Sequence, residues 1–325
     1  MRYADASRRT QVRRIGEATR RALADYGMED AALRLLCHEF NTTFRVTTSD
    51  GRRAALRVNV NSTHDVAGVT AEAEWVAAIA TETAVRVAEP VLTLDGRLAT
   101  STTCEGIDRP LAMVMYRWLE GRDLGNTPTR RQLEELGAAM AQLHDHTRDW
   151  PSERIGDRPI IGAPLMGEPD LIVDNPRLTA PQRSVIAAAR AQIDEATTSI
   201  FAGTQQLVHA DLHAWNARWH NQTLTVFDFD DCGVGTALQD LAIAAYYLRD
   251  NADHEAALHR GYETVRPLPD HDPAQYEALV AERNIVLLLS VIDSNNAAIR
   301  EFLPDYAEKT VRRLRRYLRC GRFEL

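Results

Sequence analysis

The most informative stretch of the chain reads LVHADLHAWN at residues 207–216 and is followed by VFDFD at residues 226–230. An apolar run of strand character leads into a polar loop that carries Asp211 and Asn216, and Asp228 ends the second apolar run. A carboxylate beside an acceptor hydroxyl can take its proton, and Asn and Asp oxygens are hard ligands for Mg²⁺ on phosphates. The pattern therefore predicts phosphoryl transfer, with Asp211 as general base and Asn216 and Asp228 as metal ligands.

The spacing of these residues matches the template H-R-D-x-x-x-x-N followed by D-F-G, which supplies the base and metal ligands of protein kinases. Here Asp228 lies 17 residues beyond Asp211. Ala210 replaces the arginine, Asp230 replaces the glycine, and no A-P-E follows, which argues against an activation loop anchored by arginine. Each residue alone could simply cap a loop or a strand. Their combination between two strands favours the kinase interpretation.

The first 120 residues have the pattern of a β-rich unit with few helices. Helices are expected at residues 8–26 and 68–83. Asp50-Gly51 is typical of a hairpin turn. We expect strands over residues 33–38, 44–48, 53–60, 90–94, 97–102 and 111–116.

Gly121 and Pro128 interrupt regular secondary structure, and beyond them the apolar residues mostly have helical spacing. Short strands are expected only at residues 207–210 and 224–229. We expect helices over residues 129–147, 181–201, 237–263, 273–298 and 302–319.

Composition excludes several classes of protein. The chain of 325 residues has 38 Lys and Arg against 46 Asp and Glu, a net charge of −8 that argues against non-specific nucleic-acid binding. Its four cysteines form no C-x-x-C pair, so we expect reduced thiols and no structural zinc site. No apolar leader follows Met1 and no run of 18 apolar residues occurs, so we expect a cytoplasmic protein without a membrane partner.

The segment around Asp211 resembles the aminoglycoside phosphotransferase family of kinase-like enzymes, which carries H-x-D-x-x-x-x-N and a later aspartate at a strand end. The resemblance covers roughly residues 30–300 and implies an α+β, bilobal, protein-kinase-like fold. Residues 1–120 would form a small, β-rich, nucleotide-binding N-lobe with one key helix, besides the N-terminal helix. Residues 121–325 would form a larger helical C-lobe with the catalytic loop and the acceptor site. The implied cofactors are ATP and Mg²⁺.

Within the resemblance, Asp240 matches an aspartate that supports the catalytic loop, and Ala210 stands where the family usually has glycine. We expect His209 to be structural, packing and hydrogen-bonding that loop. A metal cluster of His209 with His213 is disfavoured, because the two lie at a strand end and in a loop and not on one helix face.

The resemblance also implies a cation on a strand, paired with a carboxylate on the following helix. Arg57 stands where kinases have lysine, and its permanent charge suits phosphate. Glu72 is the expected partner, with Glu74 as the fallback and an exposed surface ion pair as the alternative.

Further nucleotide contacts are expected from loops and from the main chain. Asn41, Thr42 and Thr43 resemble the family's loop over the phosphates, although a plain hairpin turn is the alternative. The stretch MVMYRWLEG at residues 113–121 resembles the hinge, where the Arg117 carbonyl and the Leu119 amide would read adenine.

The acceptor is less constrained by the sequence. Family members phosphorylate hydroxyls of aminoglycosides, other antibiotics, choline and homoserine, and some bacterial relatives phosphorylate proteins. Three hypotheses follow. The first is a kinase for a small-molecule hydroxyl, with an aminoglycoside or another antibiotic as one candidate acceptor. The second is a Ser/Thr protein kinase of the stress-response type, and the third is a non-catalytic nucleotide-binding pseudokinase. Acids that could meet a cationic acceptor, or simply form solvated helix ends, are Asp250, Asp253 and Glu255. Tyrosines that could line the acceptor wall, or pack in the core, are Tyr246, Tyr247 and Tyr262.

Overall fold

The computed structural model describes residues 2–62, 64–156 and 158–325. The chain forms two compact units. The first contains the N-terminal segment up to Thr81 together with Val87–Leu119 and Ser294–Glu301, and the second contains Glu82–Arg86, Glu120–Asp293 and Phe302–Leu325.

The first unit is built on a five-stranded antiparallel sheet in the order β1-β2-β3-β5-β4. The hairpin between β2 and β3 turns at Gly51, whose φ of +84° suits glycine. The strands are β1 (Ala32–His38), β2 (Thr42–Thr47), β3 (Arg53–Val58), β4 (Ala99–Thr102) and β5 (Leu111–Arg117).

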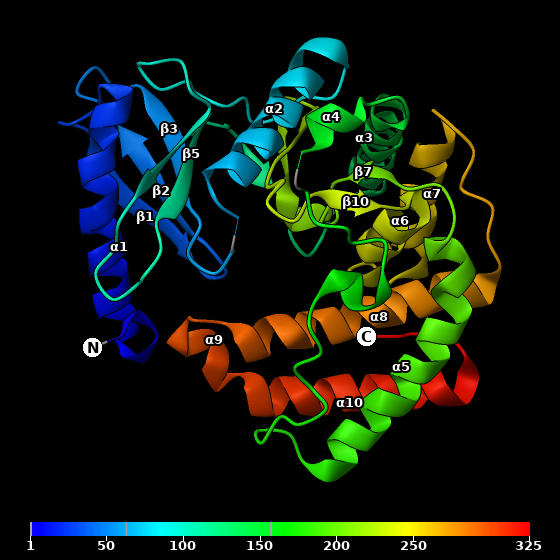
Figure 1. The fold of residues 1–325 in the computed structure, drawn as a ribbon. Coiled ribbons are helices and arrows are strands. Elements are labelled where there is room, and N and C mark those ends of the chain that lie inside the picture. Colours follow the sequence, from blue (N-terminus) through cyan, green and yellow to red (C-terminus); the bar gives the residue numbers. More distant parts are fainter. Residues whose placement is uncertain (1, 63, 157) are drawn as a thin grey trace. The chain divides into compact units, whose positions relative to one another are not determined.

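Two helices cover opposite faces of this sheet, as Figure 1 shows. They are α1 (Arg8–Ala22), which begins at the N-cap Ser7 and continues as η2 (Leu23–Tyr26), and α2 (Val66–Glu82). Alternate residues of β5 divide between the two faces, as the period of a strand requires. Met113 and Met115 join the core that includes α1, whereas Ala112 and Val114 join the core that includes α2.

The expected strand at residues 90–94 is wrong. Pro90 makes only an isolated bridge to Tyr116. Pro90 has no N–H for a ladder, and the chain then turns at once, because the Thr93 N–H donates to the Arg97 carbonyl at 2.9 Å. Leu92 and Leu94 are exposed on this turn.

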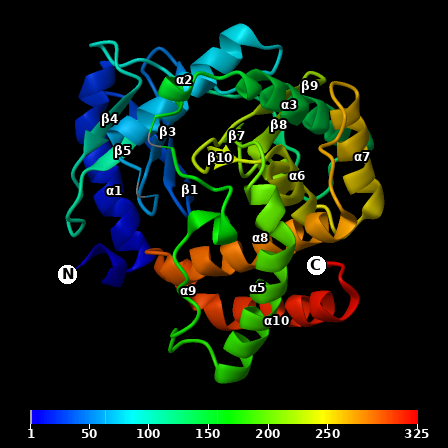
Figure 2. The same ribbon diagram turned by 45° about the vertical axis from the view of Figure 1, so that its right-hand side comes forward.

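The second unit is mainly helical, with two small sheets. One sheet has the order β6-β8-β9 and the other pairs β10 with β7. Figure 2 shows β7 and β10 beside α6. The strands are β6 (Arg122–Asp123), β7 (Gln206–Val208), β8 (Ala217–His220), β9 (Thr223–Val226) and β10 (Gly233–Gly235). Short 3-10 turns are η3 (Pro164–Gly167) and η4 (Ala214–Asn216) in this unit and η1 (Tyr3–Asp5) in the first unit.

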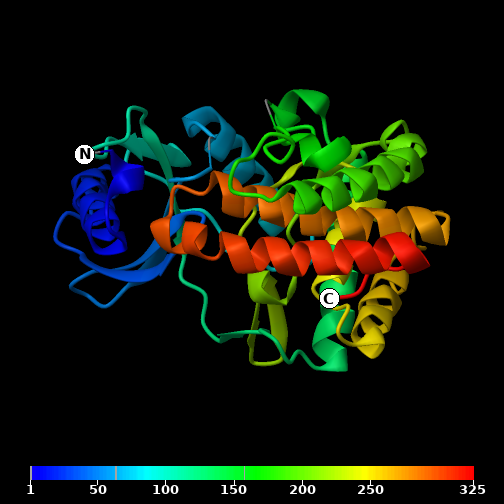
Figure 3. The ribbon, with the colours of Figure 1, turned by 90° about the horizontal axis from the view of Figure 1, so that it is seen from below.

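The helices of the second unit pack in two groups. Helix α3 lies against α7 so closely that a Cβ at Gly261 would stand 1.9 Å from the Glu134 carbonyl oxygen. Helices α5, α8 and α10 run side by side, as Figure 3 shows for α8 and α10. The helices are α3 (Arg130–Arg148), α4 (Ser152–Ile155), α5 (Ala180–Phe201), α6 (Ala237–Tyr246), α7 (Ala252–Glu263), α8 (Pro273–Asp293) and α10 (Leu303–Cys320).

Two expected long helices are each divided. Residues 237–263 form α6 and α7, because the Asn251 side chain accepts from the Asp253 N–H and caps a new helix start. Helix α8 ends at Asp293, and α9 (Ala297–Glu301) begins after Asn296, whose side chain accepts from the Ala298 N–H. Among the described helices, none combines the length and apolar character needed to cross a membrane. The four cysteines form no disulfide with one another in the described part of the chain.

Candidate active site

The loop after β7 has a fixed backbone conformation. His209 is fully buried, its Nε2 lies 3.2 Å from the Phe227 carbonyl oxygen, and its Nδ1 accepts from the Asp211 N–H at 3.3 Å. These two bonds need a neutral ring that carries its proton on Nε2. Burial lowers the pKa of His209, which agrees with the neutral form. Ala210 follows with a φ of +65°, a left-handed conformation that a non-glycine residue rarely adopts.

Asp240, in the first turn of α6, supports this loop from behind. Its Oδ1 accepts from the Ala210 N–H at 2.8 Å, and its Oδ2 lies 2.9 Å from His144 Nε2 on α3. His144 Nδ1 in turn lies 2.9 Å from the Tyr262 hydroxyl on α7. Asp240, His144 and Tyr262 are all fully buried, so this chain of hydrogen bonds ties the loop to three helices.

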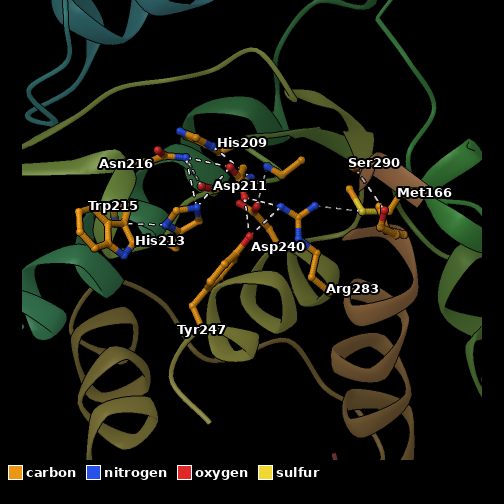
Figure 4. A network of polar contacts seen from close by, with 12 residues as sticks. Met166, His209, Asp211, His213, Trp215, Asn216, Asp240, Tyr247, Arg283 and Ser290 are labelled. Carbon is orange, nitrogen blue, oxygen red and sulfur yellow. Dashed lines mark hydrogen bonds and ion pairs between the residues drawn. The ribbon is translucent and has the colours of Figure 1, made fainter. Parts of the chain in front are cut away.

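The Asp211 carboxylate is engaged on both oxygens, as Figure 4 shows. Its Oδ2 accepts from Asn216 Nδ2 at 2.9 Å and lies 3.3 Å from His213 Nε2. Its Oδ1 accepts from Arg283 Nη2 and from the Tyr247 hydroxyl, the latter at 3.4 Å. Burial by itself raises the pKa of Asp211, but its interactions with His213 and with the Arg283 guanidinium outweigh burial and lower it. The carboxylate is therefore ionised.

Asp228 and Asn216 are joined through the backbone. The Phe227 N–H donates to the Asn216 carbonyl at 3.0 Å, and Asp228 follows directly, exposed and with a φ of +65°. Asn216 Nδ2 donates to both the side chain and the main chain of Asp211, so the amide oxygen of Asn216 is the atom available to a cation.

The donor set fits a hard divalent ion that keeps other oxygen ligands. No cluster of three or more His, Cys, Asp and Glu side chains that could hold a metal occurs in the described part of the chain. One amide oxygen and one carboxylate suit Mg²⁺, which usually takes one or two protein ligands together with water and phosphate oxygens.

In the first unit, Arg57 on β3 pairs with Glu72 on α2. The guanidinium binds both carboxylate oxygens, with Nη1 to Oε1 at 2.9 Å, and its Nε donates to Asn59 Oδ1 at 2.9 Å. The Tyr116 hydroxyl donates to Glu72 Oε1 at 2.6 Å. Arg57 is 5% exposed and Glu72 is fully buried, so this is not a surface pair, and the fallback partner Glu74 lies on the exposed side of the helix.

The other predicted nucleotide contacts are engaged within the first unit. Asn41 Oδ1 accepts from the Val60 N–H at 3.0 Å. The Thr42 hydroxyl is buried 2.8 Å from His38 Nδ1, so this side chain contributes to the interior and not to a loop surface. Arg117 ends β5, with its N–H bonded to the Glu89 carbonyl at 2.8 Å, and Leu119 is the last residue before the chain enters the second unit.

Sequence reasoning missed Arg283 and could not foresee the contact of Tyr247 with Asp211. Arg283 lies within three consecutive buried polar residues of α8, with Glu282 and Asn284 on either side. Such a polar interruption in an apolar helix is the one available signal, since buried charges are rare unless they are paired.

A model of the phosphotransferase enzyme family matches residues 39–277. The chain belongs to this family. The predicted family and the α+β kinase-like fold class are confirmed, and the chain is a phosphotransferase.

This phosphotransferase is 30% identical over 271 residues to an uncharacterised protein of Deinococcus radiodurans, which covers 79% of this chain and 76% of that protein. It is 32% identical over 170 residues to a homoserine kinase of Methylobacterium radiotolerans, covering 49% of this chain and 50% of that enzyme. Among solved structures, the microcompartment-associated aminopropanol kinase superposes with a TM-score of 0.77 at 24% identity, over 95% of this chain and 99% of that one.

The buried pair of Arg57 and Glu72 gives a stability prediction. Arg57→Met leaves the Glu72 charge buried and uncompensated, so we expect a loss of about 3–5 kcal/mol in the free energy of unfolding. In a double variant with Glu72→Leu the loss should be well below the sum of the single losses, because neither charge is left alone. Denaturant unfolding measures all three variants, with Arg97→Met, which breaks an exposed pair with Asp95, as the control. Additive losses would contradict the coupling.

Glu282 on α8 gives a prediction on pH. It is 2% exposed and accepts from the Leu165 N–H at 2.7 Å, and burial raises its pKa to about 8 although that bond lowers it. The unfolded carboxyl titrates near pH 4.3. Between these values the folded chain keeps a proton that the unfolded chain releases, so this carboxyl lowers the free energy of unfolding as the pH rises from about 5 to 8.

Glu282→Gln removes this ionisation and keeps an oxygen for Leu165, so we expect it to exceed the wild type in stability at pH 8 and to match it near pH 5. Urea unfolding at pH 5, 6.5 and 8 is the measurement, with exposed Glu263→Gln as the control. A difference between Glu282→Gln and wild type that does not change with pH would refute this account.

Proposed function

We propose that this phosphotransferase transfers the γ-phosphoryl group of ATP, with Mg²⁺, to a hydroxyl of a small molecule. The observation that carries the proposal is the environment of the Asp211 carboxylate, which is contacted by Arg283 and by the Asn216 amide. The segment that ends in Asp228 is hydrogen-bonded to the same loop. This set supplies a base and two hard oxygen ligands, which phosphoryl transfer requires.

Asp211 takes the proton of the acceptor hydroxyl as the acceptor oxygen bonds to the γ-phosphorus and ADP leaves. Asn216 and His213 contact Oδ2 of the carboxylate, and Arg283 and Tyr247 contact Oδ1. We assign the proton to Oδ1. Asn216 and Asp228 would hold the metal. When bound, Mg²⁺ would neutralise charge on the nucleotide phosphates.

We assign the nucleotide contacts to residues 1–120. Arg57 would contact a phosphate with N–H groups beyond those used for Glu72 and Asn59, since a guanidinium has five. Asn41 and Thr42 would contribute through the main chain, because their side chains are engaged elsewhere. The Arg117 carbonyl and the Leu119 amide would bind adenine.

We assign the acceptor to residues 121–325 and propose a compact hydroxylated metabolite. The homoserine kinase and the aminopropanol kinase to which the chain is similar are named for a small hydroxy amino acid and a small amino alcohol. Two of the acids that could meet a cationic acceptor have other surroundings. Glu255 pairs with Arg249, and Asp253 lies exposed in the first turn of α7.

Asp211→Asn should lower kcat for ADP release about 10²–10⁴-fold, because the amide cannot take the proton. Its affinity for Mg-ATP should stay within a few-fold of wild type, since the base acts in the transition state. Asp228→Ala should instead lose the Mg²⁺-dependent part of nucleotide affinity. The measurement is ADP release, with nucleotide binding by calorimetry with and without EDTA.

Asp149→Asn is the matched control, because that carboxylate is 89% exposed. The panel of acceptors includes amino alcohols, hydroxy acids, aminoglycosides and a protein acceptor. Turnover by Asp211→Asn at the wild-type rate would exclude Asp211 as the base. Phosphate appearing only on protein would favour a protein kinase, and nucleotide binding without ADP release would favour a pseudokinase.

A further inference from the structure

Arg283 is a buried cation that touches the proposed base. It projects from α8 and is 5% exposed. Its Nη2 donates to Asp211 Oδ1 and to the Tyr247 hydroxyl, the latter at 3.1 Å, as Figure 4 shows. Its position beside Oδ1 places a positive charge at the oxygen that would take the acceptor's proton.

The donors of Arg283 are incompletely used. Its Nη1 lies 3.9 Å from Met166 Sδ, which is only a weak acceptor. Its Nε is buried and has no hydrogen-bond partner among the described residues. A buried donor without a partner is unfavourable by about 1–3 kcal/mol, so a ligand that accepts from this guanidinium would be stabilised.

The acceptor positions of Asp211 are, by contrast, fully used. A carboxylate offers about four lone-pair sites, and Asn216, His213, Arg283 and Tyr247 approach them. An acceptor hydroxyl that reaches Oδ1 must therefore displace or loosen the bond from Arg283 or from Tyr247. Loosening the bond to Arg283 would leave a cation buried with less compensation, which is strongly unfavourable.

An acceptor that carries its own negative charge removes this penalty. A carboxylate near the reacting hydroxyl can take over the donors of Arg283 while the hydroxyl occupies Oδ1. A guanidinium matches a carboxylate in shape and can bind both of its oxygens. A cationic or neutral acceptor offers no such exchange.

We propose, resting on the proposed function, that Arg283 selects acceptors that carry a carboxylate close to the hydroxyl, that is, hydroxy acids and hydroxy amino acids. The aromatic ring of Tyr247 packs on His213 with 4.0 Å between the ring centroids, and its hydroxyl contacts Oδ1 of Asp211. The transfer step is unchanged: the hydroxyl proton goes to Asp211, the oxygen bonds to the γ-phosphorus, and ADP leaves.

Matched acceptors that differ only in the carboxylate test this inference. L-Homoserine is compared with 3-aminopropan-1-ol, and 4-hydroxybutyrate with propan-1-ol, by ADP release at saturating Mg-ATP. The wild type should favour the carboxylate member of each pair about 10–100-fold in kcat/KM, the range expected for a hydrogen bond to a charged group. Arg283→Met should bring that ratio close to one, and Arg283→Lys should keep part of it.

Arg260→Met is the matched control, because it removes an arginine on α7 whose side chain is 48% exposed and should leave the ratio unchanged. Wild-type preference for the uncharged or cationic member, or an equal ratio in wild type and Arg283→Met, would overturn the inference and leave the proposed function standing. ADP release from none of the panel would count against the proposed function instead.

Thermal unfolding tests the inference through ligand binding alone, without catalytic turnover. Protein with Mg-ADP should be stabilised by 4-hydroxybutyrate more than by propan-1-ol, and Arg283→Met should lose this difference while Arg283→Lys keeps part of it. Absence of a carboxylate-dependent shift in wild type, or its persistence in Arg283→Met, would overturn the inference whatever the turnover assay gives.

Discussion

The Asp240 carboxylate accepts the Ala210 N–H from one side and binds His144 from the other, in a fully buried position. Ala210 is held at a φ of +65°, which is unfavourable by about 1–2 kcal/mol for a residue with a Cβ. The bond to Asp240 offsets this strain and determines where the chain leaves β7. The next residue is Asp211, so the position of the proposed base depends on a contact that faces away from it.

Beyond Ala210, hydrogen bonds in both directions connect the loop to the segment around Phe227. His209 links the loop to the Phe227 carbonyl, and the Phe227 N–H returns a bond to Asn216. The segment that carries Asp228 is thereby tied to the segment that carries Asp211. Because these links are between buried groups of complementary donor and acceptor type, the loop has one favourable arrangement. This rigidity would hold the proposed base and the two proposed metal ligands in place before any substrate binds.

Helix α8 adds the charge that the loop itself lacks. Arg283 meets the Asp211 carboxylate, and its neighbour Glu282 anchors Leu165 of η3. The proposed base thus stays ionised although burial disfavours its charge. The same helix places a positive group beside Oδ1 of that carboxylate. Selectivity for the acceptor would follow from the charge balance around Asp211 and not from the catalytic loop.

The sequence predicted correctly those features that depend on residues close together in the chain. The spacing of Asp211, Asn216 and Asp228 could be recognised from sequence because one loop and the next strand end carry them. The resemblance to the family indicated Glu72 as the partner of Arg57. The prediction of a strand at residues 90–94 failed because the apolar residues Leu92 and Leu94 are exposed on a turn.

The roles of distant residues could not be predicted, because they depend on which elements pack together. Arg283 lies 72 residues from Asp211 in the chain, and only the packing of α8 brings the two together. The burial of the Thr42 hydroxyl depends likewise on His38 across the turn of a hairpin. Neither spacing carries a pattern that distinguishes it from ordinary helix or hairpin sequence.

Amide hydrogen exchange over residues 207–216 tests most directly whether Asp240 fixes the catalytic loop. In Asp240→Ala the Ala210 N–H loses its buried acceptor, so exchange of this peptide should accelerate about 10–100-fold while peptides of α5 remain as in wild type. Tyr262→Phe, which changes only the far end of the hydrogen-bond chain, should leave the peptide nearly unchanged. Equal exchange of residues 207–216 in wild type and in folded Asp240→Ala would contradict the account, because the loop would then hold its shape without Asp240.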